Sequence, residues 1–148
     1  MCRVGTRLCA VPLDQVVETM RALAVEPLPG APAFVAGVSI IRGAPVPVVD
    51  AAALLDGAAT REVATRPGRL VTLRVGERHV ALAVDEVLGV RAIPAADLRE
   101  LPPLLGEARG DGVAWLGAHD DGLLVVLEGT RLIPDSLWAA LALVEASP

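Results

Sequence analysis

The sequence predicts an all-β barrel or sandwich with small helical additions, and three observations support this fold class. Apolar residues alternate with other residues in short segments such as Arg69–Val75 and Arg78–Val84, which is the period of a half-buried strand. Turn residues recur between these segments, since 14 glycines and 12 prolines punctuate the chain. No long helical pattern alternates with the strands, which argues against a parallel α/β fold.

The overall composition indicates a folded globular protein, because 53% of the residues are hydrophobic and 21% are charged. At 148 residues, one domain is expected. The mean hydropathy of +0.55 is high, but the apolar runs 80–84, 123–127 and 137–144 are far shorter than the about 20 residues of a membrane-spanning helix. We therefore expect no membrane insertion, no signal peptide and a cytoplasmic location. A net charge of −5, with arginines scattered along the sequence, argues against direct nucleic-acid binding.

The first predicted element after Pro12 is a short helix over residues 14–23. Asp14 is a suitable N-cap, and apolar residues follow it at helical spacing. These apolar positions are Val16, Val17, Met20 and Leu23. The proline- and glycine-rich run 27–32 then ends this part of the chain.

Two strands are predicted next, Val35–Ile41 and Val46–Val49, with a turn at residues 42–44. Pro45 and Pro47 accompany the second strand, and prolines at positions i and i+2 remove two N–H donors from the same flank. That flank is therefore expected to be a sheet edge or a bulge.

The middle of the chain predicts a further hairpin. One helical turn is expected within residues 51–68, before a loop of small residues. A glycine at the start of the turn 76–77 suits a type II′ connection between the strands Arg69–Val75 and Arg78–Val84. Residues 87–93 are expected to continue the sheet.

The last third of the chain predicts turns, one more hairpin and a helix. Residues 94–112 are expected to form turns and a short helix. The strands Val113–Ala118 and Leu123–Leu127 flank a tight turn. A C-terminal helix is predicted to begin with Asp135 or Ser136 as its cap.

No residue pattern in the sequence indicates catalysis, a metal site or a cofactor. The two histidines, His79 and His119, fall in a strand and a turn, and no nucleophile with an adjacent base is recognisable. Cys2 and Cys9 are too few for a disulfide framework or a zinc site. Cys9 is predicted to be a small buried residue, and Cys2 an exposed terminal thiol. We therefore predict a protein that is not an enzyme, with no catalytic residues, no metal and no cofactor.

Arg42 is conspicuous because it is the only charged residue in the apolar segment 35–49. An arginine stays protonated, so burying it without a partner would cost more than the neighbouring apolar contacts return. Arg42 is therefore expected either to form an ion pair or to contact another molecule. The high apolar content, without pocket chemistry, favours a protein that presents apolar surface to other proteins.

The order of motifs along the chain resembles the CheW-like domain family, the coupling proteins of bacterial chemosensory arrays. The family's YAIPL-like strand end and V-x-E segment are matched by LCAVPLDQVVE, and its proline-rich turn and G-V-x-N-L-R-G by PLPGAPAFVAGVSIIRG. PVVDA matches the P-V-x-D-L element, VDEVLGV the V-D-x-V-x-x-V element, and LLVVLEGTRLI the closing strand. Their common order and spacing, from Arg7 onward, make the match specific.

The resemblance implies a single CheW-like domain over residues 1–148. Its fold would be two intertwined five-stranded SH3-like barrels that share a core and have no active site. Its function would be that of an adaptor, which joins the cytoplasmic tips of methyl-accepting chemoreceptors to the regulatory domain of a CheA-type histidine kinase. Other CheW-like proteins are further expected partners.

The resemblance also implies a receptor-binding groove. Carried over residue by residue, its positions in this chain are Val16, Glu18, Gly37, Arg42 and Val90. Glu18 is then expected to be the ionic partner of Arg42, at the boundary between core and receptor. The alternative is that Arg42 only caps a surface hairpin. The motifs do not locate the kinase-binding residues.

Departures from the family pattern support an alternative function. Residues 1–4 offer only a short first strand, which would leave a barrel edge open and weaken kinase binding. Residues 39–41 read SII where the family has V-N-L, and Asp50 is followed by alanine instead of leucine. The alternative is a divergent CheW-like protein that binds receptors or other array components, with weak or no kinase binding. A small-molecule-binding barrel and an enzyme are the hypotheses from other classes.

Overall fold

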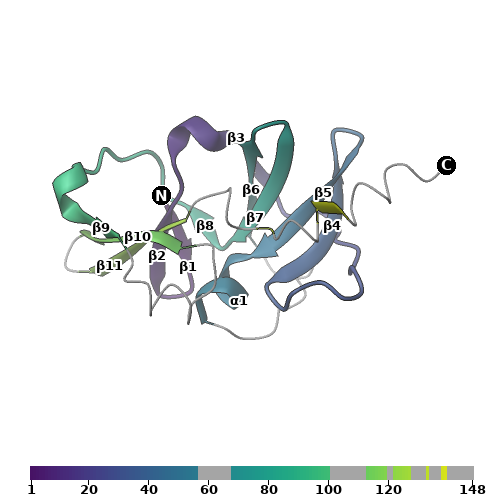
Figure 1. Ribbon diagram of the computed structural model, residues 1–148, viewed down its shortest axis with the longest axis horizontal. Helices are drawn as coiled ribbons and strands as arrows, with labels where there is room; N and C mark the ends of the chain where they lie inside the picture. Colours follow the sequence, from purple (N-terminus) through teal and green to yellow (C-terminus); the bar gives the residue numbers. More distant parts are fainter. Residues whose placement is uncertain (57–67, 101–112, 120–121, 128–132, 134–137, 140–148) are drawn as a thin grey trace.

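The computed structural model describes residues 1–56, 68–100, 113–119, 122–127, 133 and 138–139, and these fold into two mixed β-sheets with little helix (Figure 1). The first sheet has six strands in the order β8-β1-β2-β11-β10-β9. In chain order these are β1 (Cys2–Val4), β2 (Arg7–Ala10), β8 (Glu86–Val87), β9 (Leu98–Glu100), β10 (Val113–His119) and β11 (Gly122–Leu127). Neighbouring strands are antiparallel except β2 and β11, which run parallel with Cys9 opposite Val125.

The second sheet has five strands in the order β3-β6-β7-β5-β4. They are β3 (Val16–Arg21), β4 (Val35–Ile41), β5 (Ala44–Asp50), β6 (Arg69–Val75) and β7 (Arg78–Val84). Here β5 and β7 are the parallel neighbours, with Val48 opposite Ala81. Helix α1 (Ala51–Asp56) follows β5 directly, and the buried Asp50 carboxylate accepts a hydrogen bond from the Ala52 N–H at the start of this helix.

Both sheets contribute to one shared hydrophobic core. The first sheet supplies Cys9 and Leu127, and the second supplies Val49, Leu73 and Leu82, all of them fully buried. A smaller cluster covers other positions of the second sheet. Its buried members are Ile41, Val46, Val48, Leu70, Ala81 and Ala83. Strands β6 and β7 are therefore buried on both faces, because successive side chains point to opposite faces of a strand.

The helix predicted over residues 14–23 is wrong. Only Leu13–Gln15 form a turn of 3₁₀ helix, η1, and Val16–Arg21 form the strand β3. β-Branched residues favour an extended backbone here, and β3 pairs with β6. The Thr72 hydroxyl of β6 contacts both the backbone N–H and the carbonyl of Glu18, which fixes the strand further. Tertiary pairing thus overrides the local helical spacing.

The hairpin predicted over residues 35–49 is confirmed as β4 and β5. Pro47 and Pro45 lie opposite Val38 and Ile40 of β4, whereas the register with β7 begins only at Val48. The proline half of β5 therefore has β4 on one side and none of the described strands on the other. This agrees with the sequence, because the two prolines have no backbone N–H to donate to a strand on that side.

The hairpins β6–β7 and β10–β11 and the helical turn α1 are also confirmed. Gly76, with a φ of 63°, is the first residue of the β6–β7 turn, and Glu77 has no positive φ, as in a type II′ turn. Strand β8 ends at Val87, so the expected continuation of the sheet over residues 87–93 is wrong. The next residues leave the sheet at Gly89, whose φ is 116°.

The segment 94–112 is described only as far as residue 100. It contains the 3₁₀ turn η3 (Ala95–Asp97), as expected, and the strand β9, which the sequence did not predict. The predicted helix cap at Asp135 or Ser136 lies outside the described residues.

The prediction that the first strand leaves an open barrel edge is wrong, and so is the prediction that Cys2 is exposed. β1 is short, but it pairs with β2 on one side and with β8 on the other, so it is not an open edge. Cys2 lies inside this arrangement and is only 2% exposed. Cys9 is fully buried, as predicted. Local sequence does not reveal the burial of Cys2, because its cover comes from strands distant in the chain.

Candidate functional site: an apolar groove beside the shared core

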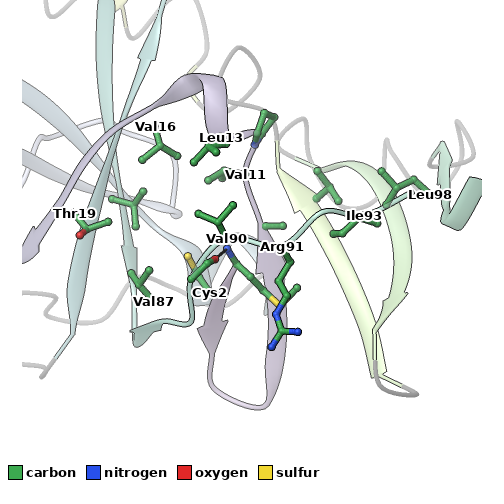
Figure 2. A pocket seen from close by; sticks show the side chains of 16 residues that line it. Cys2, Val11, Leu13, Val16, Thr19, Val87, Val90, Arg91, Ile93 and Leu98 are labelled. Atoms are coloured by element: carbon green, nitrogen blue, oxygen red, sulfur yellow. Dashed lines mark hydrogen bonds between the residues drawn. The ribbon is translucent and has the colours of Figure 1, made fainter. Parts of the chain in front are cut away.

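A groove of about 610 Å³ opens beside the shared core (Figure 2). Its walls come from both sheets: from β1, β2, β9 and β11 of the first, from β3 and β6 of the second, and from η1 and the segment after β8. The lining is mostly apolar, with Thr19 and Arg91 as its polar side chains. It consists of Met1, Cys2, Ala10, Val11, Pro12, Leu13, Val16, Thr19, Val71, Val87, Gly89, Val90, Arg91, Ile93, Leu98 and Val126.

Two apolar side chains at this groove are exposed to an unusual degree. Leu13 of η1 is 62% exposed and Val90, after β8, is 71% exposed. Figure 2 shows both close to Val11 and Val16 around the same hollow. Exposed apolar residues that cluster around a concave surface are typical of protein-binding sites.

A β-bulge in β3 decides which side chains reach the groove. The register passes from Val16 opposite Leu73 to Glu18 opposite Thr72, so Val17 is the extra residue. Val16 and Thr19 both line the groove as a result. Glu18 precedes Thr19 directly and therefore leaves the strand on the opposite face.

Glu18 instead forms an ion pair with Arg42. The Arg42 Nε and Nη2 donate to the two carboxylate oxygens of Glu18 at 2.7 and 2.6 Å. The hydrogen bond and the charge of Arg42 lower the pKa of Glu18, and Glu18 in turn raises the pKa of Arg42. The Arg42 side chain is 77% exposed, so the pair lies at the surface. This geometry confirms the expected pairing of the two residues.

The ion pair joins the two edges of the second sheet. β3 is one edge strand in the sheet order, and Arg42 follows the other edge strand, β4. The two edges therefore approach each other, and the sheet curls toward a closed barrel. A backbone bridge between Glu26 and Val38, with two hydrogen bonds of 2.8 Å, ties the chain after β3 to β4 as well. We call the Arg42–Glu18 contact the seam.

Arg42 adopts a backbone conformation that disfavours arginine. Its φ is 51°, and that of Gly43 is 80°, so both central residues of the β4–β5 turn are left-handed. This pattern is that of a type I′ turn, which favours asparagine followed by glycine. Backbone strain of this kind is kept where other constraints over-determine it, and functional sites are the usual place. Neither the turn nor an exposed ion pair explains arginine at this position through stability alone.

Gly37 has a packing role. Its φ is 148°, and a Cβ atom here would overlap the backbone carbonyl of Glu26. It also lies at the register shift of β4, where Val35 faces Val49 and Gly37 faces Val48. Gly37 therefore allows the segment after β3 to cross β4 closely.

The five predicted site residues thus separate into three places. Val16 and Val90 line the groove, Glu18 and Arg42 form the seam, and Gly37 lies under the crossing segment. The sequence did not single out Leu13, Thr19, Ile93 or Leu98, which also line the groove. An apolar residue directly after a proline in a turn, as in Pro12-Leu13, is a signal that could have found the first of these.

The described residues provide no site for metal chemistry. No group of three or more histidine, cysteine, aspartate or glutamate side chains comes together among them. None of the described helices is long and apolar enough to cross a membrane.

Comparison with known proteins gives a consistent result. Residues 1–136 match the CheW-like domain family. Protein FrzA of Myxococcus xanthus is 40% identical over 113 residues, which cover 76% of this chain and 66% of FrzA, so the chain spans just under two thirds of that relative. Chemotaxis protein CheW of Rhizobium meliloti is 32% identical over 132 residues, which cover 89% of this chain and 84% of that protein.

A solved structure has the same fold. The scaffolding protein TtCheW from Thermoanaerobacter tengcongensis superposes with a TM-score of 0.68 at 21% sequence identity, over 85% of this chain and 84% of that one. The predicted fold class is therefore confirmed. The two mixed sheets of this chain are consistent with a pair of SH3-like barrels around a shared core.

Proposed function

Because this chain belongs to the CheW-like domain family, whose members are non-catalytic scaffold proteins, we propose that it is an adaptor in a bacterial chemosensory array. In this proposal the chain works in the cytoplasm as a single domain over residues 1–148. It joins the signalling tips of methyl-accepting chemoreceptors to the regulatory domain of a CheA-type histidine kinase. Other CheW-like proteins are further partners.

The observation that carries the proposal is the open apolar groove. A receptor tip is helical, and helices bind proteins by laying an apolar face into a groove of this kind. Leu13 and Val90, at 62% and 71% exposure, offer apolar surface that a helix would cover. Covering such side chains is favourable by roughly 25 cal/mol per Å² of apolar surface.

The seam supports the same proposal from a different direction. Arg42 is strained in its turn, exposed, and held in a fixed orientation by Glu18. An arginine held in this way presents charge to an approaching partner without having to be ordered on binding. We therefore assign Val16 and Val90 to apolar contact with the receptor, and Glu18 and Arg42 to its polar contact.

Weak or absent kinase binding remains the alternative form of the proposal. Its original basis was an open edge at the first strand, and β1 has strands on both sides. No surface of the described residues favours lost kinase binding over retained binding. We therefore include the kinase among the proposed partners.

Isothermal titration of the purified chain with a helical receptor-tip fragment tests the proposal. We expect binding, and we expect Val90→Glu to weaken it about 30-fold, which corresponds to about 2 kcal/mol. Folding should be unaffected because Val90 is 71% exposed. Leu123→Glu is the matched control, since Leu123 is 55% exposed on β11 but does not line the groove.

Two results would count against the proposal. Absence of binding to any receptor tip from the same cell would remove the adaptor function. Equal weakening by Val90→Glu and Leu123→Glu would show that binding does not use the groove. A second titration with the kinase regulatory domain separates the adaptor from its receptor-only alternative.

A further inference from the structure

Cys2 and Cys9 face each other across the β1–β2 hairpin as direct partners in the register. Directly opposed residues of an antiparallel pair have Cα atoms about 4.5 or 5.5 Å apart. Both spacings fall within the about 4.4–6.8 Å that a disulfide accepts. A bond between the two sulfur atoms therefore needs only a local adjustment of the hairpin.

The two thiols differ in access. Both side chains are buried, at 2% and 0% exposure. Cys2 lines the groove, where Figure 2 shows its sulfur, whereas Cys9 is not part of the lining. A small oxidant that enters the groove therefore reaches Cys2 first.

The pKa values of the two thiols also favour Cys2 as the more reactive one. A hydrogen bond with Cys9 lowers the pKa of Cys2 to about 7, against the opposing effect of burial. The same hydrogen bond, together with burial, raises the pKa of Cys9. Because the thiolate is the reactive form, Cys2 is the nucleophile of the pair and Cys9 the protonated partner.

We propose that Cys2 and Cys9 are a redox-modification site, at which a peroxide oxidises Cys2 and Cys9 completes a reversible disulfide. The Cys2 thiolate attacks one oxygen of hydrogen peroxide, the O–O bond breaks, and a sulfenic acid and hydroxide result. That hydroxide takes the proton of the Cys9 thiol, and the resulting Cys9 thiolate attacks the Cys2 sulfur, which forms the S–S bond and displaces the sulfenic oxygen as hydroxide. Two electrons pass from the two sulfurs to the peroxide, and an added dithiol reverses the reaction by exchange.

Peptide mapping of the folded wild-type chain after treatment with hydrogen peroxide tests this proposal. The chain has no lysine, so trypsin cleaves only after arginine and releases Cys2 in peptide 1–3 and Cys9 in peptide 8–21. Without reductant, we expect the two peptides to be linked, with a loss of two hydrogen atoms. Dithiothreitol should restore the separate peptides.

Single variants test the order of reaction. In Cys9→Ala, dimedone should trap a sulfenic acid on Cys2. In Cys2→Ala, trapping on Cys9 should be about tenfold slower, because Cys9 is fully buried and does not line the groove, whereas Cys2 does. In urea the difference between the two variants should disappear, because the fold creates it. Circular dichroism confirms that both variants fold before they are compared.

The proposal is overturned if folded wild-type protein gives no linked peptide under conditions that oxidise a free model thiol. It is equally overturned if Cys9 reacts as fast as Cys2 in the folded single variants. If either variant fails to fold, dimedone competition in the wild-type chain decides: capture on Cys2 supports the assigned order, and capture on Cys9 contradicts it. None of these outcomes depends on receptor binding, so the proposed function is tested separately.

Discussion

The groove and the seam offer a partner two different kinds of contact, although one strand supplies both. The groove is apolar and concave, with Val16 and Thr19 of β3 in its wall. The seam is a single exposed ion pair, to which β3 contributes Glu18. Apolar burial provides most of the affinity of a complex, whereas exposed charges mainly affect orientation and association rate.

The bulge in β3 is what separates these two chemistries. Without the extra residue at Val17, side chains at positions 16 and 18 would point to the same face. With it, residues 16 and 19 face the groove and residue 18 faces the seam. Residues 16, 18 and 19 of one strand can therefore serve two surfaces, and each surface can be tested by itself.

Gly37 belongs to neither region, and the largest effect is expected there. Gly37→Ala should destabilise the protein by about 3 kcal/mol, because a Cβ atom would overlap the Glu26 carbonyl at a positive φ. Gly30→Ala is the matched control: its φ is also positive, at 79°, but its surroundings are open. It should cost about 1 kcal/mol. Urea denaturation measures both, and equal losses would contradict the packing role of Gly37.

The groove is tested next, with a charge placed in its wall. Thr19→Glu should weaken receptor-tip binding about tenfold, because a partner's apolar face would then cover a carboxylate. Val17→Glu is the control on the same strand, since Val17 is 49% exposed and does not line the groove. Titration calorimetry on both variants compares them. A similar loss in both would mean that the bulge does not separate two surfaces.

The seam should show a smaller effect on binding and a distinct effect on stability. Arg42→Ala and Arg42→Asn both remove the ion pair, and each should reduce receptor-tip affinity about threefold. The asparagine variant should have the higher melting temperature of the two, because asparagine tolerates the φ of 51° at this position. If affinity is unchanged while the melting temperature falls steeply in both, Arg42 only closes the barrel.

The smallest effect is expected from pH. The folded pKa of Glu18 lies below its usual value of 4.5, because Arg42 stabilises the carboxylate. The unfolded chain therefore binds this proton more readily, and the contribution of the pair is present above pH 4.5 and lost as pH falls through the folded pKa. Urea melts at neutral and at acidic pH measure this contribution. The stability difference between wild type and Arg42→Ala should shrink in acid, and a difference that grows would contradict the pairing.

Local patterns predicted the hairpins correctly where strand alternation and turn residues agree. The β6–β7 hairpin follows from its alternation and Gly76, and β4–β5 from its apolar run and the turn at Arg42-Gly43. β3 was predicted as a helix because its apolar spacing fits both periods, and only pairing with β6 decides between them. Edge strands with few apolar residues carry the weakest local signal.

The site could be predicted only in part, because pairing between distant strands decides which residues come together. The motif resemblance located Val16 and Val90 and paired Glu18 with Arg42, but it assigned all of these to one groove. Their separation depends on the bulge at Val17, which is a property of pairing between two strands. The burial of Cys2 likewise depends on β8, which lies far along the chain. Such contacts have no signature in a local stretch of sequence.

The parallel pairing of β2 with β11 has a consequence for how the protein is made. Leu8 lies opposite Leu124, so the first sheet cannot close until the ribosome has released the C-terminal strands. The second sheet uses only residues 16–84 and is complete in the nascent chain much earlier. During that interval its apolar inner face, with Leu73 and Leu82, has no β11 to cover it. At a synthesis rate of about 5–20 residues per second, this inner face therefore stays uncovered for seconds.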